Sequence, residues 1–127
     1  MRIKGKVVKG IGESGSFLSI DWVNEQLCEK LRFLPFRGTL NITVNDAKIQ
    51  GILKERCMDR LVSHAEGFCD AILVKGRIND SYDCGVVIPL VEEYDERLLE
   101  IVAPVHLKQT LHLGDGDEVV LDLDIED

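Results

Sequence analysis

The chain has 127 residues, 45% of them hydrophobic, and its 23 acidic and 15 basic side chains give a net charge of −8. This length predicts a single domain, residues 1–127. The acidic balance argues against a nucleic-acid partner, which needs Lys and Arg to neutralise phosphates. No apolar run approaches the ~18 residues of a membrane span, and the start of the chain has no apolar signal segment. We therefore expect a cytoplasmic protein with no membrane partner.

The first third of the chain predicts two strands, a glycine-rich loop and a helix. Residues 3–9 alternate between apolar and polar side chains, as a half-buried strand does. Three glycines follow within 10–16, and 17–20 has the pattern of a second short strand. Asp21 is a favourable N-cap for a helix over 22–33. Apolar residues at every fourth position form the expected core stripe of that helix: Val23, Leu27 and Leu31.

The segment 38–44 is the most informative strand of the sequence. Thr39 and Asn41 alternate with apolar residues, so their side chains share one face of the strand. A hydroxyl and an amide oxygen placed side by side can bind a hard cation such as Mg²⁺, with the other ligand positions left to water and phosphate. The alternative is an ordinary half-exposed strand whose polar residues face solvent.

The rest of the chain predicts mainly short strands. Pro104 suits the first position of a second helix, which ends near Gly114. The expected strands cover 49–53, 68–78, 83–90, 98–103 and 119–125. Together with the strands before them, they predict an all-β fold, a barrel or a sandwich, with two short helices.

The glycine loop is the first candidate for chemistry. Gly10, Gly12 and Gly15 follow a strand, and glycines at such a place free backbone N–H groups to approach phosphates. A dinucleotide-binding site would need a helix directly afterwards, and the pattern at 17–20 is that of a strand, so this reading fails. A phosphate cradle and a plain hairpin loop both stay open.

Two further segments carry charged groups in informative places. Glu100 lies within the apolar strand 98–103, where a carboxylate is costly to bury without a partner and can accept a proton from a hydroxyl. The alternative is a glutamate that faces water from an edge strand. His106 and Lys108 lie at the start of the second helix, where anions are favoured, although they also fit an amphipathic surface helix.

Taken in order, these four segments describe the parts of a phosphoryl-transfer site. Their sequences, including Pro-x-x-Gly-Thr-Leu-Asn at 35–41 and Glu-Ile-x-Ala-Pro at 100–104, resemble those of the archaeal-type, CTP-dependent riboflavin kinases. The similarity extends from about Gly5 to Glu118 and includes Gly10–Glu13 and Gly114–Asp117. The resemblance implies a small closed six-stranded barrel of the cradle-loop type.

The resemblance also implies an activity and a set of site residues. The family transfers a phosphate from CTP to the ribityl hydroxyl of riboflavin, giving FMN and CDP. By resemblance, Thr39 and Asn41 hold Mg²⁺, Glu92 and Glu100 contact the flavin, and Glu100 is the general base. The implied nucleotide-binding residues are Ile11, Gly12, Glu13, Ser14, Gly15, Ser16, Val105, His106, Leu107 and Lys108. We expect a monomer whose partners are these small molecules.

Three places depart from the family pattern. Ser14–Ser16 replace the usual end of the glycine loop, Lys108 replaces a common Arg, and Glu92 stands where Thr is usual. A carboxylate at 92 would repel a product phosphate unless its side chain faces away. Two alternatives therefore stay open: a related kinase with a different acceptor alcohol, and a barrel that binds a nucleotide or flavin as a regulator without transferring phosphate.

Overall fold

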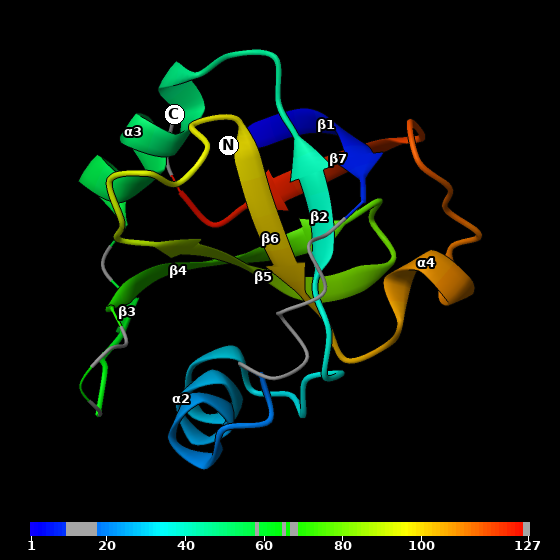
Figure 1. Cartoon of the computed structure of the whole chain (residues 1–127). Coiled ribbons are helices and arrows are strands. Elements are labelled where there is room, and N and C mark those ends of the chain that lie inside the picture. Colours follow the sequence, from blue (N-terminus) through cyan, green and yellow to red (C-terminus); the bar gives the residue numbers. More distant parts are fainter. Residues whose placement is uncertain (10–17, 58, 65, 67–68, 126–127) are drawn as a thin grey trace.

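The computed structural model describes residues 1–9, 18–57, 59–64, 66 and 69–125 (Figure 1). Within these residues the chain forms three helices: α2 (Asp21–Leu31), α3 (Lys48–Arg56) and α4 (Leu107–Thr110). The strands in the same residues are β1 (Arg2–Val8), β2 (Leu40–Thr43), β3 (Asp59–Leu61), β4 (Ala71–Ile78), β5 (Tyr82–Pro89), β6 (Leu98–Val102) and β7 (Glu118–Leu123).

Six of these strands close into a barrel. The hydrogen-bonded order is β4-β5-β6-β2-β1-β7, and β7 pairs in turn with β4, while β3 extends the sheet beyond β4. Every pairing is antiparallel. Because the sheet closes, each of the six strands has a hydrogen-bonded neighbour on both sides. Paired edges cannot bind a strand of another chain, which removes a common route to aggregation. The expectation of an all-β, closed six-stranded barrel is confirmed.

Alternation along the strands fills the barrel with aliphatic side chains. Ile3, Gly5 and Val7 of β1 are buried, whereas the residues between them are exposed. The same period places Leu40 and Ile42 of β2 in the interior, as it does Leu99 and Ile101 of β6. The side chains between these positions therefore point out of the barrel, and these outward positions carry the candidate site.

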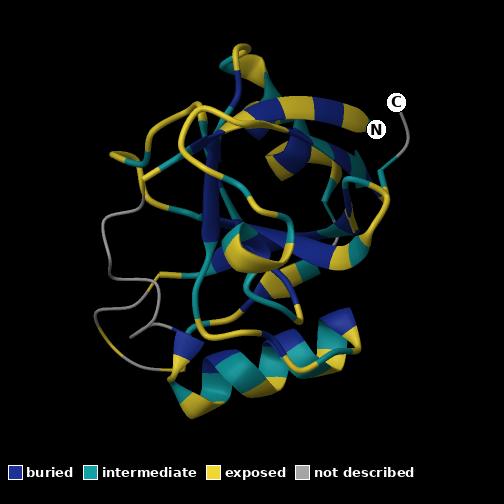
Figure 2. Ribbon diagram, turned by 90° about the vertical axis from the view of Figure 1, so that its right-hand side faces the viewer, coloured by how far each residue is buried: buried dark blue, intermediate teal, exposed yellow. Residues whose placement is uncertain are grey.

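Helix α2 covers part of the outer face of the barrel (Figure 2). Val23, Leu27 and Leu31 are buried, as the spacing of four predicts. They share a second apolar cluster with outward residues of β4, β5 and β6, among them Leu73 and Val87. The helix lies close because Gly85 has no side chain: a Cβ there would come within 2.8 Å of Leu31 Cδ2.

The strand expected at 49–53 is wrong, because this segment is helix α3. Alternation would place Ile49, Gly51 and Leu53 on one face. Instead Gln50 and Leu53 are the buried residues, three positions apart, which is the spacing of one helix face. Leu53 belongs to the barrel core. The structure thus has a helix that the sequence pattern did not predict.

Two other expectations about elements are corrected. Leu18 is helical and fully buried under α2, and the Asn24 side-chain amide donates to its carbonyl oxygen, so 18–20 do not form a strand. The last helix begins at Leu107 and not at Pro104, because 104–105 form a bend before it.

Within the described residues, no helix is long and apolar enough to cross a membrane.

Candidate functional site

Thr39, directly before β2, and Asn41, within it, lie side by side, as the alternation predicts. The Thr39 hydroxyl donates a hydrogen bond to Asn41 Oδ1 over 3.0 Å. Asn41 is 8% exposed, one of two buried polar residues of the described chain. Just before the strand, the backbone N–H of Phe36 donates to the carbonyl of Ala103 over 2.8 Å, which ties the approach to β2 to the chain that leaves β6.

Strand β6 brings Glu100 next to this pair. Glu100 lies directly opposite Asn41 in the β2–β6 register and opposite Val87 in the β5–β6 register. Directly opposite residues have Cβ atoms about 4.5–5.5 Å apart. A strand paired on both sides is not an edge strand, so the alternative of an edge glutamate facing water is wrong. Glu100 is half-buried and points out of the barrel.

A tyrosine that the sequence analysis did not single out contacts this carboxylate. The hydroxyl of Tyr94 donates to Glu100 Oε2 over 2.7 Å. Burial of the phenol and its hydrogen bond to Glu100 raise the pKa of Tyr94, so the hydroxyl stays protonated at neutral pH. Glu100 thus has a neutral hydrogen-bond donor and no paired cation at this contact.

The segment 105–108 forms the other wall of the site. His106 is the N-cap of α4, and its Nδ1 accepts a hydrogen bond from the backbone N–H of Gln109 over 3.2 Å. Its ring makes an edge contact with Phe36, with 4.8 Å between ring centroids. The Lys108 amine lies 3.6 Å from Asp115 Oδ1 at the surface. One imidazole and one amine are therefore available at this wall, with the amine already near a carboxylate.

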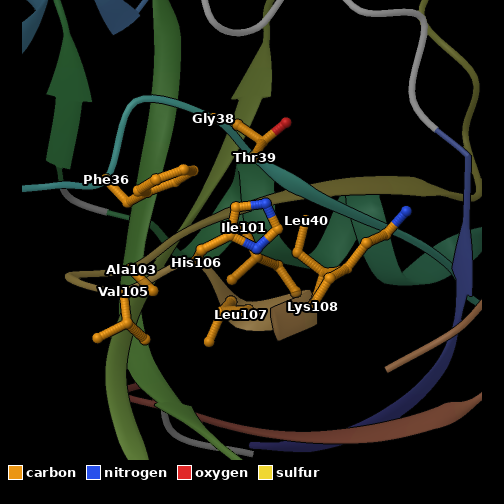
Figure 3. A pocket seen from close by; sticks show the side chains of 10 residues that line it. All are labelled: Phe36, Gly38, Thr39, Leu40, Ile101, Ala103, Val105, His106, Leu107 and Lys108. Atoms are coloured by element: carbon orange, nitrogen blue, oxygen red, sulfur yellow. The ribbon is translucent and has the colours of Figure 1, made fainter. Parts of the chain in front are cut away.

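A cavity of about 210 Å³ lies between these two walls (Figure 3). Its lining combines residues before and within β2, residues at the end of β6, and α4: Phe36, Gly38, Thr39, Leu40, Ile101, Ala103, Val105, His106, Leu107 and Lys108. Pockets for whole drug-sized ligands have about 300–1,000 Å³. This cavity therefore fits one part of a nucleotide, such as its base, and not two complete substrates.

Comparisons with known proteins place the chain in a family of kinases. Residues 7–123 match the family model CTP-dep_RFKase, which is described as "Domain of unknown function DUF120". The chain belongs to this family. It is 39% identical over 115 residues to a riboflavin kinase of Methanothermobacter thermautotrophicus, a match that covers 91% of this chain and 93% of that protein.

Other relatives carry the same name and are longer. A riboflavin kinase of Saccharolobus solfataricus is 36% identical over 129 residues, covering 97% of this chain and 74% of the relative. One of Methanosarcina barkeri is 34% identical over 129 residues, covering 97% of this chain and 56% of the relative. The chain therefore spans about half the length of the Methanosarcina relative.

For this member of the family, the structure brings together most of the expected site residues that lie within its described part. Thr39 lines the cavity with all four residues of 105–108. Thr39 also bonds Asn41, and Asn41 lies opposite Glu100, so the residues form a continuous row. Glu92 is exposed in the connection between β5 and β6. The glycine-loop residues Ile11 to Ser16 lie outside the described residues.

Sequence reasoning did not identify Phe36 or Tyr94 as site residues. Phe36 follows a proline in an irregular segment, and Tyr94 lies in a connection of eight residues with no period to interpret. Phe36 is 40% exposed and lines the cavity, with its ring against that of His106. Its position two residues before the Gly-Thr-Leu-Asn motif is the signal that could have found it.

Proposed function

We propose that this chain is a CTP-dependent riboflavin kinase, which transfers the γ-phosphate of CTP to the ribityl hydroxyl of riboflavin and gives FMN and CDP. The observation that carries the proposal is the row Thr39–Asn41–Glu100 on one outer face, beside a cavity walled by 105–108. The family match and the relatives named riboflavin kinase support the choice of substrates.

Thr39 and Asn41 are suited to hold Mg²⁺. Their oxygens are 3.0 Å apart, and two neighbouring ligands of an octahedral ion at ~2.1 Å are also about 3 Å apart. Both ligands are neutral, which leaves the charge of the ion to be balanced by phosphate oxygens. Bound Mg²⁺ would neutralise charge on the transferring phosphate.

Val105 to Lys108 and the loop Ile11 to Ser16 would hold the nucleotide. The cavity has room for a base, and its wall combines apolar side chains with the polar side chains of Thr39, His106 and Lys108. The Lys108 amine would attract a phosphate at the rim, in competition with Asp115. This arrangement keeps the phosphates of the donor close to Thr39, at the start of the row that leads to Glu100.

Glu100 would act as the general base, and Glu92 would lie near the flavin. One carboxylate oxygen of Glu100 accepts a hydrogen bond from Tyr94, so the other remains for the acceptor hydroxyl. Glu100 takes the hydroxyl proton as that oxygen bonds to the γ-phosphorus, and the bond from phosphorus to the bridging oxygen breaks to release CDP. The protein supplies positioning and charge, the main needs of phosphoryl transfer.

The test is FMN and CDP formation by the purified chain from riboflavin and Mg²⁺, with CTP and ATP compared directly. We expect FMN with CTP and little with ATP. Glu100→Gln should lower kcat by about 100- to 10,000-fold, whereas Glu118→Gln, which changes an exposed glutamate on β7, should not alter the rate. Tight CTP or flavin binding without FMN would favour a regulatory barrel, and CDP formation only with another alcohol would favour a different acceptor.

The state and place of the protein belong to the same proposal. We propose that it acts as a monomer, because the row of site residues and its cavity need no second copy of the chain, and that it works in the cytoplasm. Size-exclusion chromatography with light scattering at the assay concentration measures the mass directly. A dimer as the active species would contradict the monomer.

A further inference from the structure

The connection between β5 and β6 carries a half-buried tyrosine to the candidate base. Tyr94 packs its ring against the barrel core and donates its hydroxyl to Glu100 Oε2 over 2.7 Å. The residues on both sides of it in this connection are exposed. An inward tyrosine flanked by exposed residues, with its hydroxyl on one carboxylate, suggests a specific task for that hydroxyl.

The backbone around Tyr94 is held by a turn within the connection on one side and by a bond from the end of β2 on the other. The backbone N–H of Tyr94 donates to the carbonyl of Val91 over 3.2 Å. On the other side, the backbone N–H of Val44 donates to the carbonyl of Arg97 over 2.8 Å. This fixes the path of the connection where it joins β6.

Helix α3 supplies a second anchor for the same segment. Gln50, 3% exposed, donates through its Nε2 to the carbonyls of Asp95 and Leu98, each over 2.7 Å. Gln50 and Asn41 are the two buried polar residues of the described chain. Asn41 lies opposite Glu100, and Gln50 bonds the connection that carries Tyr94. Burying an amide is favourable only when it is hydrogen-bonded, so this anchor is a built feature of the fold.

The contact restricts what Glu100 can do. A glutamate side chain has three rotatable bonds, and a hydroxyl bonded to Oε2 limits the carboxylate to orientations that keep this bond. Oε1 is then the oxygen directed to an acceptor hydroxyl. Positioning of this kind matters because a misplacement of about 1 Å can reduce a rate about 100-fold.

We propose that Tyr94 is the positioning residue of the catalytic carboxylate, acting through Glu100 and touching neither substrate. This inference rests on the proposed function, since it assigns a role within that reaction. It predicts an effect on the chemical step and not on substrate binding. It also predicts that Tyr94 matters only while Glu100 is present.

The test variant is Tyr94→Phe, which removes the hydroxyl and keeps the ring. We expect kcat to fall about 10- to 100-fold, while KM for CTP and for riboflavin stays within about twofold. The matched control is Tyr82→Phe, at the other tyrosine of the chain, on β5, and it should leave both constants unchanged. A loss of folding would change both constants and the active fraction together, which active-site titration with riboflavin separates.

The double variant Tyr94→Phe/Glu100→Gln separates positioning from a direct role. It should be no slower than Glu100→Gln alone, because the hydroxyl has no further carboxylate to orient. An unchanged kcat in Tyr94→Phe, a raised KM alone, or losses that multiply in the double variant would each overturn the inference while the kinase proposal stands. Absence of FMN with the unaltered chain would instead overturn the proposed function and this role with it.

Discussion

At the scale of single residues, the pair Thr39–Asn41 is the sharpest test of the metal site. Asn41→Ala should lower kcat/KM at least about 100-fold, because it removes the amide oxygen that would bind the metal. Asn41 is buried, so water does not easily take the place of that oxygen. Thr39→Ala should instead raise the Mg²⁺ concentration for half-maximal rate about tenfold, since water can take the place of one hydroxyl. Rates measured against Mg²⁺ concentration give both values.

The control for this prediction lies on the same strand and face. Thr43→Ala removes a hydroxyl two positions after Asn41, opposite Leu98 and away from the cavity residues. Its Mg²⁺ dependence should match that of the unaltered chain. If Asn41→Ala has the same Mg²⁺ dependence as Thr43→Ala, the assignment of Asn41 to the metal is wrong.

A buried thiol elsewhere in the barrel is not part of any site. Cys84 lies on β5 in the barrel core, and burial, with the charge of Asp83, raises the pKa of its thiol to about 12. The thiol is therefore neutral at physiological pH and a poor nucleophile.

At the scale of elements, α2 forms the apolar cover of the outer face beside the site. Leu27→Ala should reduce the free energy of unfolding by about 2–5 kcal/mol, because Leu27 is fully buried and leaves a cavity between helix and barrel. Glu25→Ala, an exposed position of the same helix, should change it by less than about 0.5 kcal/mol. Urea denaturation measures both, and similar values for the two variants would contradict this account of the packing.

The elements also show what sequence reasoning can and cannot predict. Helix α2 was predictable because its stripe has a clean period of four, and β2 because its alternation is strict. Helix α3 was missed because one of its two buried residues is polar, Gln50. Its side chain is buried because it donates to the carbonyls of Asp95 and Leu98, which lie 45 and 48 positions later in the chain. Its start does carry a signal, since the Asp46 side chain accepts a hydrogen bond from the backbone N–H of Lys48.

The candidate site divides in the same way. Thr39, Asn41 and Glu100 were predictable as outward residues of strands, because a period of two fixes the face. Which strands are neighbours, however, depends on the barrel order, in which β6 lies next to β2 although more than fifty residues separate them. The contact of Tyr94 with Glu100 depends on that order and on a connection anchored from α3, so local pattern could not give it.

At the scale of the whole molecule, the site depends on closure of the barrel. The last strand pairs with β1 on one side and β4 on the other, and the N-terminal amine donates to the carbonyls of Leu123 and Ile125. Closure holds β1 against β2, and β2 against β6, which sets Asn41 opposite Glu100. A defect at the β4–β7 seam should therefore affect both stability and activity.

Gly76 is the position where this seam can be tested. A Cβ at Gly76 would lie 2.8 Å from Leu123 Cδ2 and 3.0 Å from Leu123 Cα, and would also meet the carbonyl oxygen of Asp122. Gly76→Ala must push β7 away, because backbone atoms cannot rotate aside as a side chain can. We expect the free energy of unfolding to fall by about 1–3 kcal/mol, as in other overpacked sites.

Gly51→Ala is the matched substitution with the opposite expected sign. Gly51 lies within α3 with open space where a Cβ would stand, so alanine there favours the helix and should add about 0.5–1 kcal/mol. Urea denaturation gives the free energy of unfolding of both variants, and FMN formation is measured in parallel. The pair compares one glycine-to-alanine change at the seam with the same change away from it. A Gly76→Ala variant as stable as the unaltered chain would contradict the overpacking at the seam, and a destabilised variant with unchanged FMN formation would contradict the dependence of the Asn41–Glu100 register on closure.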